Sequence, residues 1–228
     1  MTKDTQARSD SQSNTQRAVA ELREMIFQGA LSPGSDHLEV ELAAKLGMSR
    51  TPIREAALTL EAQGLVALRP RRGMRILPLS AEDMAEIYDV MTELESLAAE
   101  KAALKSYTAD DLTPLAKSID AMDAALAASD RDAWAQADGC FHQELVRLGG
   151  NARIMAIVTM MEDQIRRAKT VTLYMRPLPT ASNIDHRAVF DAIAKGDGQA
   201  ARRIHHAHRK KARDVLVSLL EKHRLHSI

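Results

Sequence analysis

Apolar residues recur at helical spacing from Asn14 onward, on a face made by Val19, Leu22, Met25 and Ile26. Gly29 and the Ser-Pro-Gly turn that follows it end this first helix. The same periodicity predicts a second helix over residues 39–46 and a third between Pro52 and Gly64. Proline near the start of the third helix is favourable, because the first turn leaves its N–H groups unpaired in any case.

Two short segments with strand character follow, at residues 65–68 and 74–77, and a turn with the sequence RPRRG joins them. A helix, a helix-turn-helix and a β-hairpin in this order are typical of a winged helix, which we expect over residues 14–78. Residues 1–13 lack apolar periodicity and are predicted to form a disordered tail.

Residues 79–228 differ in character, since helical periodicity continues there without any strand signal. Start signals with capping-box spacing occur at Ser80, Thr108 and Ser129, and a proline-rich loop is expected over residues 175–183. The pattern predicts six helices, at residues 81–105, 109–128, 131–148, 152–173, 183–195 and 198–223. The chain is therefore expected to be mainly α, with an N-terminal winged helix-turn-helix followed by an all-α antiparallel helical bundle.

The composition agrees with this architecture. The chain has 228 residues, 45% of them hydrophobic, which suffices for one large domain or two ordinary ones. Aromatic residues make up only 3%, which favours helices over a β-sandwich. Cys140 is the only cysteine, so disulfides and multi-cysteine zinc sites within one chain are excluded, and its side chain is expected to be buried. The chain has no apolar run of membrane-spanning length and no leader, which predicts a soluble cytoplasmic protein without a membrane partner.

The net charge is zero, from 31 basic and 31 acidic residues, but the charges are unevenly distributed. Residues 42–77 hold seven basic against two acidic residues, a net charge of +5. Residues 80–138 hold four against fourteen, a net charge of −10, and residues 195–224 hold nine against three, a net charge of +6. We expect the last basic helix to pair with the acidic helices of the bundle; a second nucleic-acid site is the alternative.

The first basic segment coincides with the parts that a winged helix offers to DNA. Arg50 and Arg54 are four residues apart and share one face of the third helix, from which they can reach phosphates or guanine edges. Arg71, Arg72 and Gly73 lie at the hairpin tip, where glycine lets the backbone come close to DNA. A solvated basic face is the alternative, but a helix-turn-helix followed by a basic wing favours DNA binding.

Four residues of the bundle are candidate metal ligands. Asp138 and His142 are four residues apart, so both side chains project from one face of a helix. His186 and His208 come from the last two predicted helices, and one carboxylate with three imidazoles suits one divalent transition metal per chain, either Zn²⁺, Ni²⁺, Mn²⁺ or Fe²⁺. The alternatives are a simple helix pair with surface histidines, or a set in which His205 replaces His208.

Two motifs characterise the first half, SRTPIREA at residues 49–56 and LEAQGLV at residues 60–66. They resemble the winged-helix domain of GntR-family bacterial transcription regulators. By this resemblance, the DNA contacts would come from Arg50, Thr51, Arg54, Arg72 and Gly73. Members of this family commonly form homodimers on pseudo-palindromic operators, so double-stranded DNA and a second copy of the chain are the expected partners.

The second half carries the motifs YDV at residues 88–90, DGCFH at residues 138–142 and HRAVFDAI at residues 186–193. It resembles the ligand-sensing FCD domain of the FadR subfamily, and its six predicted helices are similar to the VanR-type branch. The resemblance implies metal ligands at Asp138, His142, His186 and His208.

Many relatives carry an arginine on the first sensor helix that holds the carboxylate of an effector. This chain has Met91 at that position. Without the guanidinium group, a carboxylate effector needs another partner, and Arg166 and Arg167 are the candidates to supply it.

The predicted function is that of a DNA-binding transcription regulator, a repressor, whose operator affinity changes when a small-molecule effector, a carboxylate, binds in the metal-containing bundle. One alternative is a regulator for which the ion itself is the signal, and another is a metal-dependent enzyme. The enzyme is disfavoured because the sequence around the four ligands supplies no general base or nucleophile.

Overall fold

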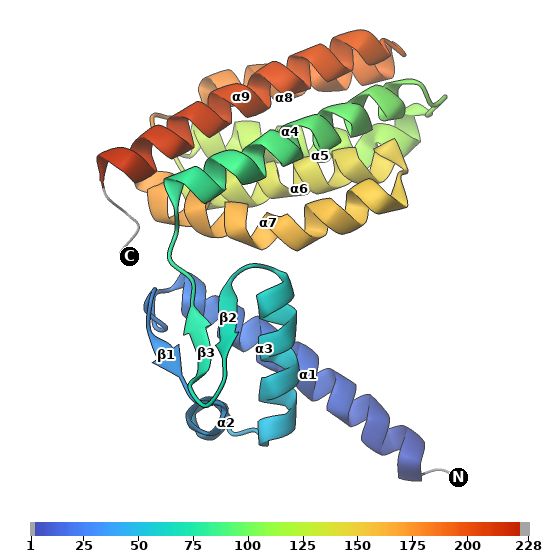
Figure 1. Ribbon diagram of the computed structural model, residues 1–228. Helices are drawn as coiled ribbons and strands as arrows, with labels where there is room; N and C mark the ends of the chain where they lie inside the picture. The colour runs from blue at the N-terminus through green and yellow to red at the C-terminus, as the bar shows by residue number, and fades with distance from the viewer. Residues whose placement is uncertain (1–2, 224–228) are drawn as a thin grey trace. The chain divides into compact units, whose positions relative to one another are not determined.

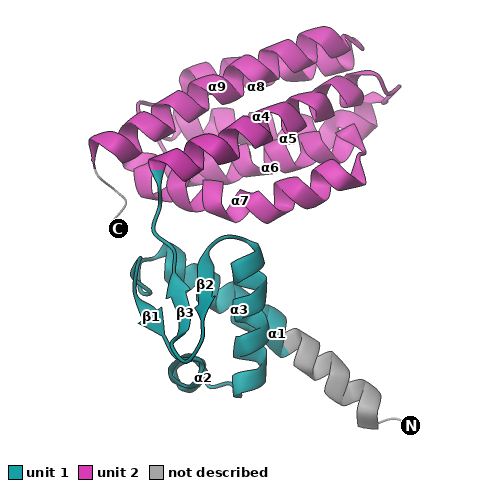
Figure 2. Ribbon diagram, viewed as in Figure 1, with its two compact units in different colours: residues 1–80, 224–228 teal, residues 81–223 magenta. Residues whose placement is uncertain are grey.

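The computed structural model describes the backbone of residues 3–223 and the side chains of residues 14–223. The chain divides into two compact units (Figure 2), of which the first ends at Ser80 and the second runs from Ala81 to His223. The boundary expected from the sequence, after Pro78, lies two residues earlier. The tail predicted over residues 1–13 lies outside the residues whose side chains are described.

The first unit is a winged helix-turn-helix, as predicted (Figure 1). Its elements are α1 (Lys3–Phe27), β1 (Asp36–His37), α2 (Glu39–Leu46), α3 (Arg50–Ala62), β2 (Val66–Arg69) and β3 (Gly73–Ile76). The helix-turn-helix consists of α2 and α3, and β2 and β3 form the hairpin. The sequence analysis missed β1, because a strand of two residues has no periodicity. This strand pairs with β3, so the antiparallel sheet has the order β1-β3-β2.

One apolar core holds the helices of this unit against the sheet. The buried face of α3 consists of Pro52, Ile53, Ala56, Ala57 and Leu60. It belongs to the same cluster as Leu22 of α1, Val66 of β2 and Ile76 of β3. Because the core occupies this face of α3, the opposite face, which includes Arg50 and Arg54, remains exposed.

The second unit is all-helical, and the six predicted helices are confirmed. They are α4 (Ala81–Ala103), α5 (Ala109–Ala127), α6 (Arg131–Gly149), α7 (Ala152–Thr172), α8 (Thr180–Ala194) and α9 (Gly198–Lys222), with the short 3₁₀ helix η1 (Leu173–Met175) after α7. The prediction placed the start of α8 at residue 183, which is too late, because the last proline, Pro179, is the N-cap and leaves the next residues free to be helical. Among residues 3–223, no helix combines the length and the apolar character needed to cross a membrane.

The helix starts confirm one predicted cap and correct another. At α5 the Asp111 N–H donates to Thr108 Oγ1 (3.3 Å) and the Thr108 N–H donates to Asp111 Oδ2 (2.8 Å), which is the predicted capping box. At α6 the cap is Asp130, which accepts from the Ala133 N–H, and not the predicted Ser129. Ser129 has a φ of 57° and forms the turn before the helix.

The core of the bundle lies between α4, α5, α6, α8 and α9, with Phe141 and Leu145 of α6 completely buried in it. Cys140 is exposed, so the prediction of a buried cysteine was wrong. The next residue, Phe141, faces the core, and consecutive helical positions point about 100° apart. A close crossing joins α4 and α6, because a Cβ atom added at Gly149 would lie 2.8 Å from the Cβ atom of Ala98.

Candidate functional site

The winged helix presents the predicted DNA-contacting arginines on its surface. Arg50, Thr51 and Arg54 are exposed on α3, and Arg72 is exposed at the hairpin tip. The Arg50 side chain is 71% exposed and lies 3.7 Å from a carboxylate oxygen of Glu39. Such a long, solvated ion pair is weak, so Arg50 can exchange it for a phosphate.

Four other arginines of this unit fall into two groups. Arg69 and Arg75 share the carboxylate of Asp36, at 3.7 Å and 4.0 Å. Arg54 and Arg72 have no ion pair within residues 14–223. The uncompensated positive charge of this unit is therefore concentrated on α3 and at the hairpin tip, where a winged helix meets DNA.

Gly73 has a structural role of its own. Its φ is +77°, and a Cβ atom there would lie 2.1 Å from the carbonyl oxygen of His37. Glycine is thus required for the close approach of β3 to β1, and its predicted contact with DNA stays a prediction. Arg71 also has a positive φ, of 64°, which turns the chain at the tip.

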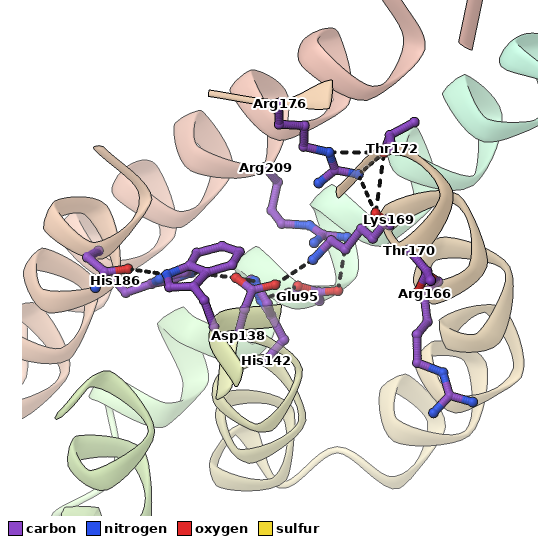
Figure 3. A network of polar contacts seen from close by, with 12 residues as sticks. Glu95, Asp138, His142, Arg166, Lys169, Thr170, Thr172, Arg176, His186 and Arg209 are labelled. Carbon is purple, nitrogen blue, oxygen red and sulfur yellow. Dashed lines mark hydrogen bonds and ion pairs between the residues drawn. The ribbon is translucent and has the colours of Figure 1, made fainter. Parts of the chain in front are cut away.

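The four predicted metal ligands come together in the second unit. α6 supplies Asp138 and His142, α8 supplies His186 and α9 supplies His208. Each of the four side chains is buried, and one potential ligand atom from each lies within 4.8 Å of those of the others. The chain segments involved are far apart in sequence, so the helical packing alone creates this cluster, of which Figure 3 labels Asp138, His142 and His186.

Two of the three imidazoles direct a nitrogen at the same carboxylate oxygen. Asp138 Oδ1 lies 3.6 Å from His142 Nε2 and 3.4 Å from His186 Nε2. Both nitrogens are buried and have no hydrogen-bond partner among the described residues, and the same holds for His186 Nδ1. Buried polar atoms without partners are rare in folded proteins. A bound ion or small molecule would therefore give these nitrogens the partner that the described residues do not supply.

Two of the histidines contact a carboxylate through their other nitrogen. His142 Nδ1 lies 3.0 Å from Oε2 of Glu95 on α4, and His208 Nδ1 lies 3.6 Å from Oδ2 of Asp185 on α8. A carboxylate behind an imidazole fixes the orientation of the ring and makes its second nitrogen a better metal ligand. Glu95 and Asp185 are absent from the predicted site.

A second buried group surrounds Glu95. Glu95, His142 and His205 also have potential ligand atoms within 4.8 Å of one another. His205 Nε2 lies 3.4 Å from His142 Nδ1, and its Nδ1 lies 3.2 Å from the Ser96 hydroxyl. His205 therefore lies behind His142, and the first group contains His208 rather than His205.

Arg209 of α9 balances the charge of Glu95. Its Nη2 lies 3.3 Å from Glu95 Oε1, its guanidinium lies over the ring of Tyr88 at 4.6 Å from the centroid, and its side chain is 2% exposed. On α4, Tyr88 comes three residues before Met91 and Glu95 comes four residues after it, so all three lie on the same side of the helix. Arg209 thus lies beside the helix positions that neighbour Met91, and its charge is compensated by Glu95.

The burial of the cluster determines which groups carry charge. Burial lowers the pKa of His186, of His205 and of His208, so these imidazoles are neutral and their lone pairs are available. Burial opposes the ionisation of Glu95, but Arg209 and His142 outweigh it and hold the pKa of this carboxyl below its ordinary value. Likewise, Lys169 and His142 hold the pKa of Asp138 well below its ordinary value against the effect of burial.

A pocket of about 200 Å³ adjoins the first group. Its polar end includes Asp138, Lys169, Arg176 and His208, and its apolar wall includes Trp134, Leu173, Pro177 and Leu178. An apolar wall with a few converging polar groups is typical of a small-molecule site.

Neither candidate for the effector carboxylate lines this pocket. Arg166 pairs with Asp163 at 3.1 Å, its side chain is 54% exposed, and it points away from the cluster (Figure 3). Arg167 is buried on α7. Lys169 and Arg176 line the pocket instead. The sequence offered no signal for this, because Arg176 lies beyond the end of α7.

The last basic helix pairs with the acidic first helix of the bundle, as expected. Arg202 contacts Glu93 at 3.1 Å and Glu100 at 2.9 Å, and Arg213 contacts Asp89 at 3.2 Å. α4 and α9 lie side by side along their lengths (Figure 1). The charge of these α9 residues is thus compensated within the bundle.

Comparison with known families agrees with both units. The family described as "Bacterial regulatory proteins, gntR family" matches residues 14–76, and the FCD domain matches residues 86–211. The chain belongs to the GntR family. This GntR-family chain is a DNA-binding transcription regulator with an FCD effector domain, and the relatives that it matches are named as transcription regulators, not as enzymes.

Individual relatives of this GntR-family regulator extend over most of the chain. An uncharacterized HTH-type regulator from an unstable DNA locus of Streptomyces ambofaciens is 30% identical over 224 residues, 97% of this chain and 91% of the relative. A Paenarthrobacter nicotinovorans protein, named "Probable D-xylose utilization operon transcriptional repressor", is 31% identical over 176 residues, 77% of this chain and 76% of the relative. The solved structure of a GntR regulator from Rhodococcus sp. RHA1 has a TM-score of 0.72 and 25% identity, and the match covers 90% of this chain and 98% of that one.

Proposed function

We propose that this regulator is a homodimeric repressor whose FCD domain holds one divalent transition metal ion and binds a small carboxylate effector beside it. The observation that carries the proposal is the buried group of Asp138, His142, His186 and His208, whose ligand atoms lie within 4.8 Å of one another. A change in the affinity for DNA then follows if the effector prefers one conformation of the protein over another.

The donor set fits a metal such as Zn²⁺, Ni²⁺, Mn²⁺ or Fe²⁺. Three imidazoles and one carboxylate are borderline donors, which these ions prefer over Ca²⁺ or Mg²⁺. The buried nitrogens without hydrogen bonds, on His142 and His186, are the atoms that such an ion would satisfy. When bound, the ion supplies a Lewis acid to which a carboxylate can bind.

The residues around the ligands support this assignment. Carboxylate oxygens of Glu95 and Asp185 lie 3.0 Å from His142 Nδ1 and 3.6 Å from His208 Nδ1, and so orient the two rings. Both carboxylates lie outside the ligand set, so they orient the rings without occupying the ion's position. The neighbouring pocket opens beside Asp138 and His208, where an effector would reach the ion directly.

For DNA, we propose contacts from Arg50, Thr51 and Arg54 of α3 and from Arg72 of the wing. All four are exposed. A winged helix of this size offers few base contacts, so two copies on a pseudo-palindromic operator would supply the specificity that one copy lacks. Repression is supported by the relative from Paenarthrobacter nicotinovorans, which is named a repressor.

The first test is elemental analysis of tag-free protein together with a His142→Ala variant. We expect about one transition metal ion per wild-type chain and none in the variant. Binding to a DNA site selected from a random pool is then measured with and without a chelator, over a salt series. Absence of metal from both proteins would refute the metal centre, and a flat salt dependence would refute the phosphate contacts.

A regulator that senses the ion itself is the second candidate, since the cluster would serve it equally well. The two candidates differ in metal affinity. A sensor must release its ion within the cellular concentration range, whereas an ion that holds an effector stays bound. Operator binding that follows the free ion concentration without any organic anion would favour the sensor.

A further inference from the structure

Lys169 forms an ion pair with Asp138, one of the four candidate metal ligands. Its Nζ lies 2.6 Å from Asp138 Oδ2, whereas the other carboxylate oxygen, Oδ1, faces His142 and His186. Figure 3 shows the ammonium group of Lys169 directed at Asp138 from α7. Asp138 is thus shared between a lysine and the position where an ion would bind. Two cations on one buried carboxylate repel each other strongly, so each weakens the binding of the other.

The Lys169 side chain can move away from Asp138 into the pocket. Its side chain is 19% exposed, whereas that of Asp138 is 3% exposed, and Lys169 lines the pocket beside the cluster. A lysine side chain has a flexible four-carbon stem, so the ammonium can turn from the carboxylate into the pocket without any movement of the helix.

Arg176 lines the same pocket and forms no ion pair with a carboxylate of residues 14–223. Its Nε donates to the Thr172 hydroxyl at 3.0 Å and its Nη2 donates to the Lys169 carbonyl at 3.4 Å, both of them neutral groups. Among residues 14–223, no carboxylate forms an ion pair with Arg176, and its Nη1 has no hydrogen-bond partner. A half-buried guanidinium that donates only to neutral groups can still bind an anion through charge-assisted hydrogen bonds.

A count of charges gives the same result. Glu95 offsets Arg209, Asp138 offsets Lys169 and Asp185 offsets Lys211, which leaves Arg176 without a paired carboxylate among the described residues. A divalent ion on Asp138 would add two further positive charges to a site shielded from water. Buried charge of one sign is costly unless it is paired, so the filled cluster requires a negative group in the pocket.

We infer that Lys169 is an exchangeable counter-ion, which holds Asp138 while the metal site is empty and turns to an anionic ligand beside Arg176 once the ion is bound. The ion and the anion therefore bind cooperatively, and Lys169 carries part of the coupling. This inference rests on the metal centre proposed above and adds to it the residues that recognise the anion, a carboxylate attached to an apolar body that fits against Trp134.

The test measures the affinity of Zn²⁺ and Mn²⁺ by competition with a chelating dye, in a buffer free of carboxylate and phosphate. Lys169→Met should bind the ion about tenfold or more tightly than the wild type, because the competing ammonium is gone. Lys169→Arg keeps the charge and should stay close to the wild type. Lys211→Met is the matched control: it removes an ammonium from the same pocket, but one that is 65% exposed and paired with Asp185.

Acetate then serves as the anion probe. It should tighten ion binding by the wild type several-fold and by Lys169→Met much less. Trp134 is the only tryptophan and lines the pocket, so its fluorescence reports acetate binding independently of the dye. The midpoint of thermal unfolding shows that each variant is folded.

The direction in which Lys169→Met changes the affinity for the ion tests the inference. If Lys169→Met binds the ion as weakly as the wild type or more weakly, Lys169 only positions Asp138, and the inference is overturned. Equal effects of acetate on the wild type and on Lys169→Met would overturn the coupling. Failure of the wild type to bind either ion would instead refute the metal centre itself, which separates the two proposals.

Discussion

Replacing Glu95 by glutamine removes one negative charge from the centre of the bundle with little change in volume. Glu95 Oε2 lies 3.0 Å from His142 Nδ1, and Oε1 lies 3.3 Å from Arg209 Nη2. The substitution therefore affects two interactions at once, the orientation of a proposed metal ligand and the neutralisation of a buried arginine. These two effects have different magnitudes and different assays.

The loss of metal affinity follows from the role of a carboxylate behind a metal-bound imidazole. Loss of such a group weakens metal binding by about 10-fold to 100-fold, which corresponds to about 1.4–2.7 kcal/mol. The loss of stability without metal is larger. Arg209 is 2% exposed, and a buried charge deprived of its partner costs about 3–5 kcal/mol.

Metal affinity is measured by competition with a chelator, and stability by urea denaturation of the metal-free protein. Glu93→Gln is the control, since Glu93 lies on the same helix and pairs with Arg202 but is 59% exposed. It should change stability by no more than about 1 kcal/mol and leave metal affinity unchanged. The double variant Glu95→Gln/Arg209→Met should regain most of the lost stability while metal binding stays weak.

Wild-type metal affinity in Glu95→Gln would refute the role of Glu95 in orienting His142. Equal losses of stability in Glu95→Gln and Glu93→Gln would refute the view that Glu95 and Arg209 form a buried pair whose members depend on each other. Because the two results concern different measurements, one half of the reasoning can fail without the other.

Three further predictions concern other parts of the chain. Arg54→Ala should weaken DNA binding and lower the slope of log affinity against log salt by about one, as measured by fluorescence anisotropy; an unchanged slope would exclude a phosphate contact. Gly73→Ala should cost at least about 1–2 kcal/mol of stability in urea, because φ is +77° and the added methyl group would meet the carbonyl oxygen of His37. Asp123→Asn should destabilise the bundle at neutral pH but not in acid: the hydrogen bond from Asn183, followed by Arg187, lowers the pKa of Asp123, and this stabilisation is lost as the pH falls below about 4 and through the folded-state pKa. A gap between wild-type and variant melting temperatures that persists in acid would contradict the last prediction.

Local signals were sufficient to predict most of the fold. Helices with clear apolar periodicity, such as α2 and α6, were found within a few residues, and the capping box at Thr108 was correct in detail. The misses have local reasons as well. β1 is too short to have a period, and at α8 the proline-rich segment ends at Pro179, where proline is compatible with a helix start. Asp130 competes with Ser129 for the cap of α6, and the positive φ of Ser129 settles the choice.

The site was predictable only in part. Asp138 and His142 share a helix face by spacing, and a family resemblance supplied His186 and His208. The groups around them depend on which helices pack together, because Glu95 reaches His142 from α4 and Arg209 reaches Glu95 from α9. A charged residue in an amphipathic helix usually faces solvent, so nothing in the local pattern identified Glu95 or Arg209 as buried.

The close approach of Gly149 to Ala98 makes one half of the cluster geometrically rigid. Two helices that touch at their backbones have no intervening layer of side chains to rearrange, so α4 and α6 cannot slide past each other without steric overlap. Glu95 lies on α4, and Asp138 and His142 lie on α6. The distance from Glu95 to His142 is thus set by helix packing, and an ion of unsuitable radius in the proposed site would have to be accommodated by His186 and His208 on α8 and α9. The protein would then discriminate between metals by how far these two helices have to move, so the choice of metal becomes a mechanical property of helix packing as well as of donor chemistry.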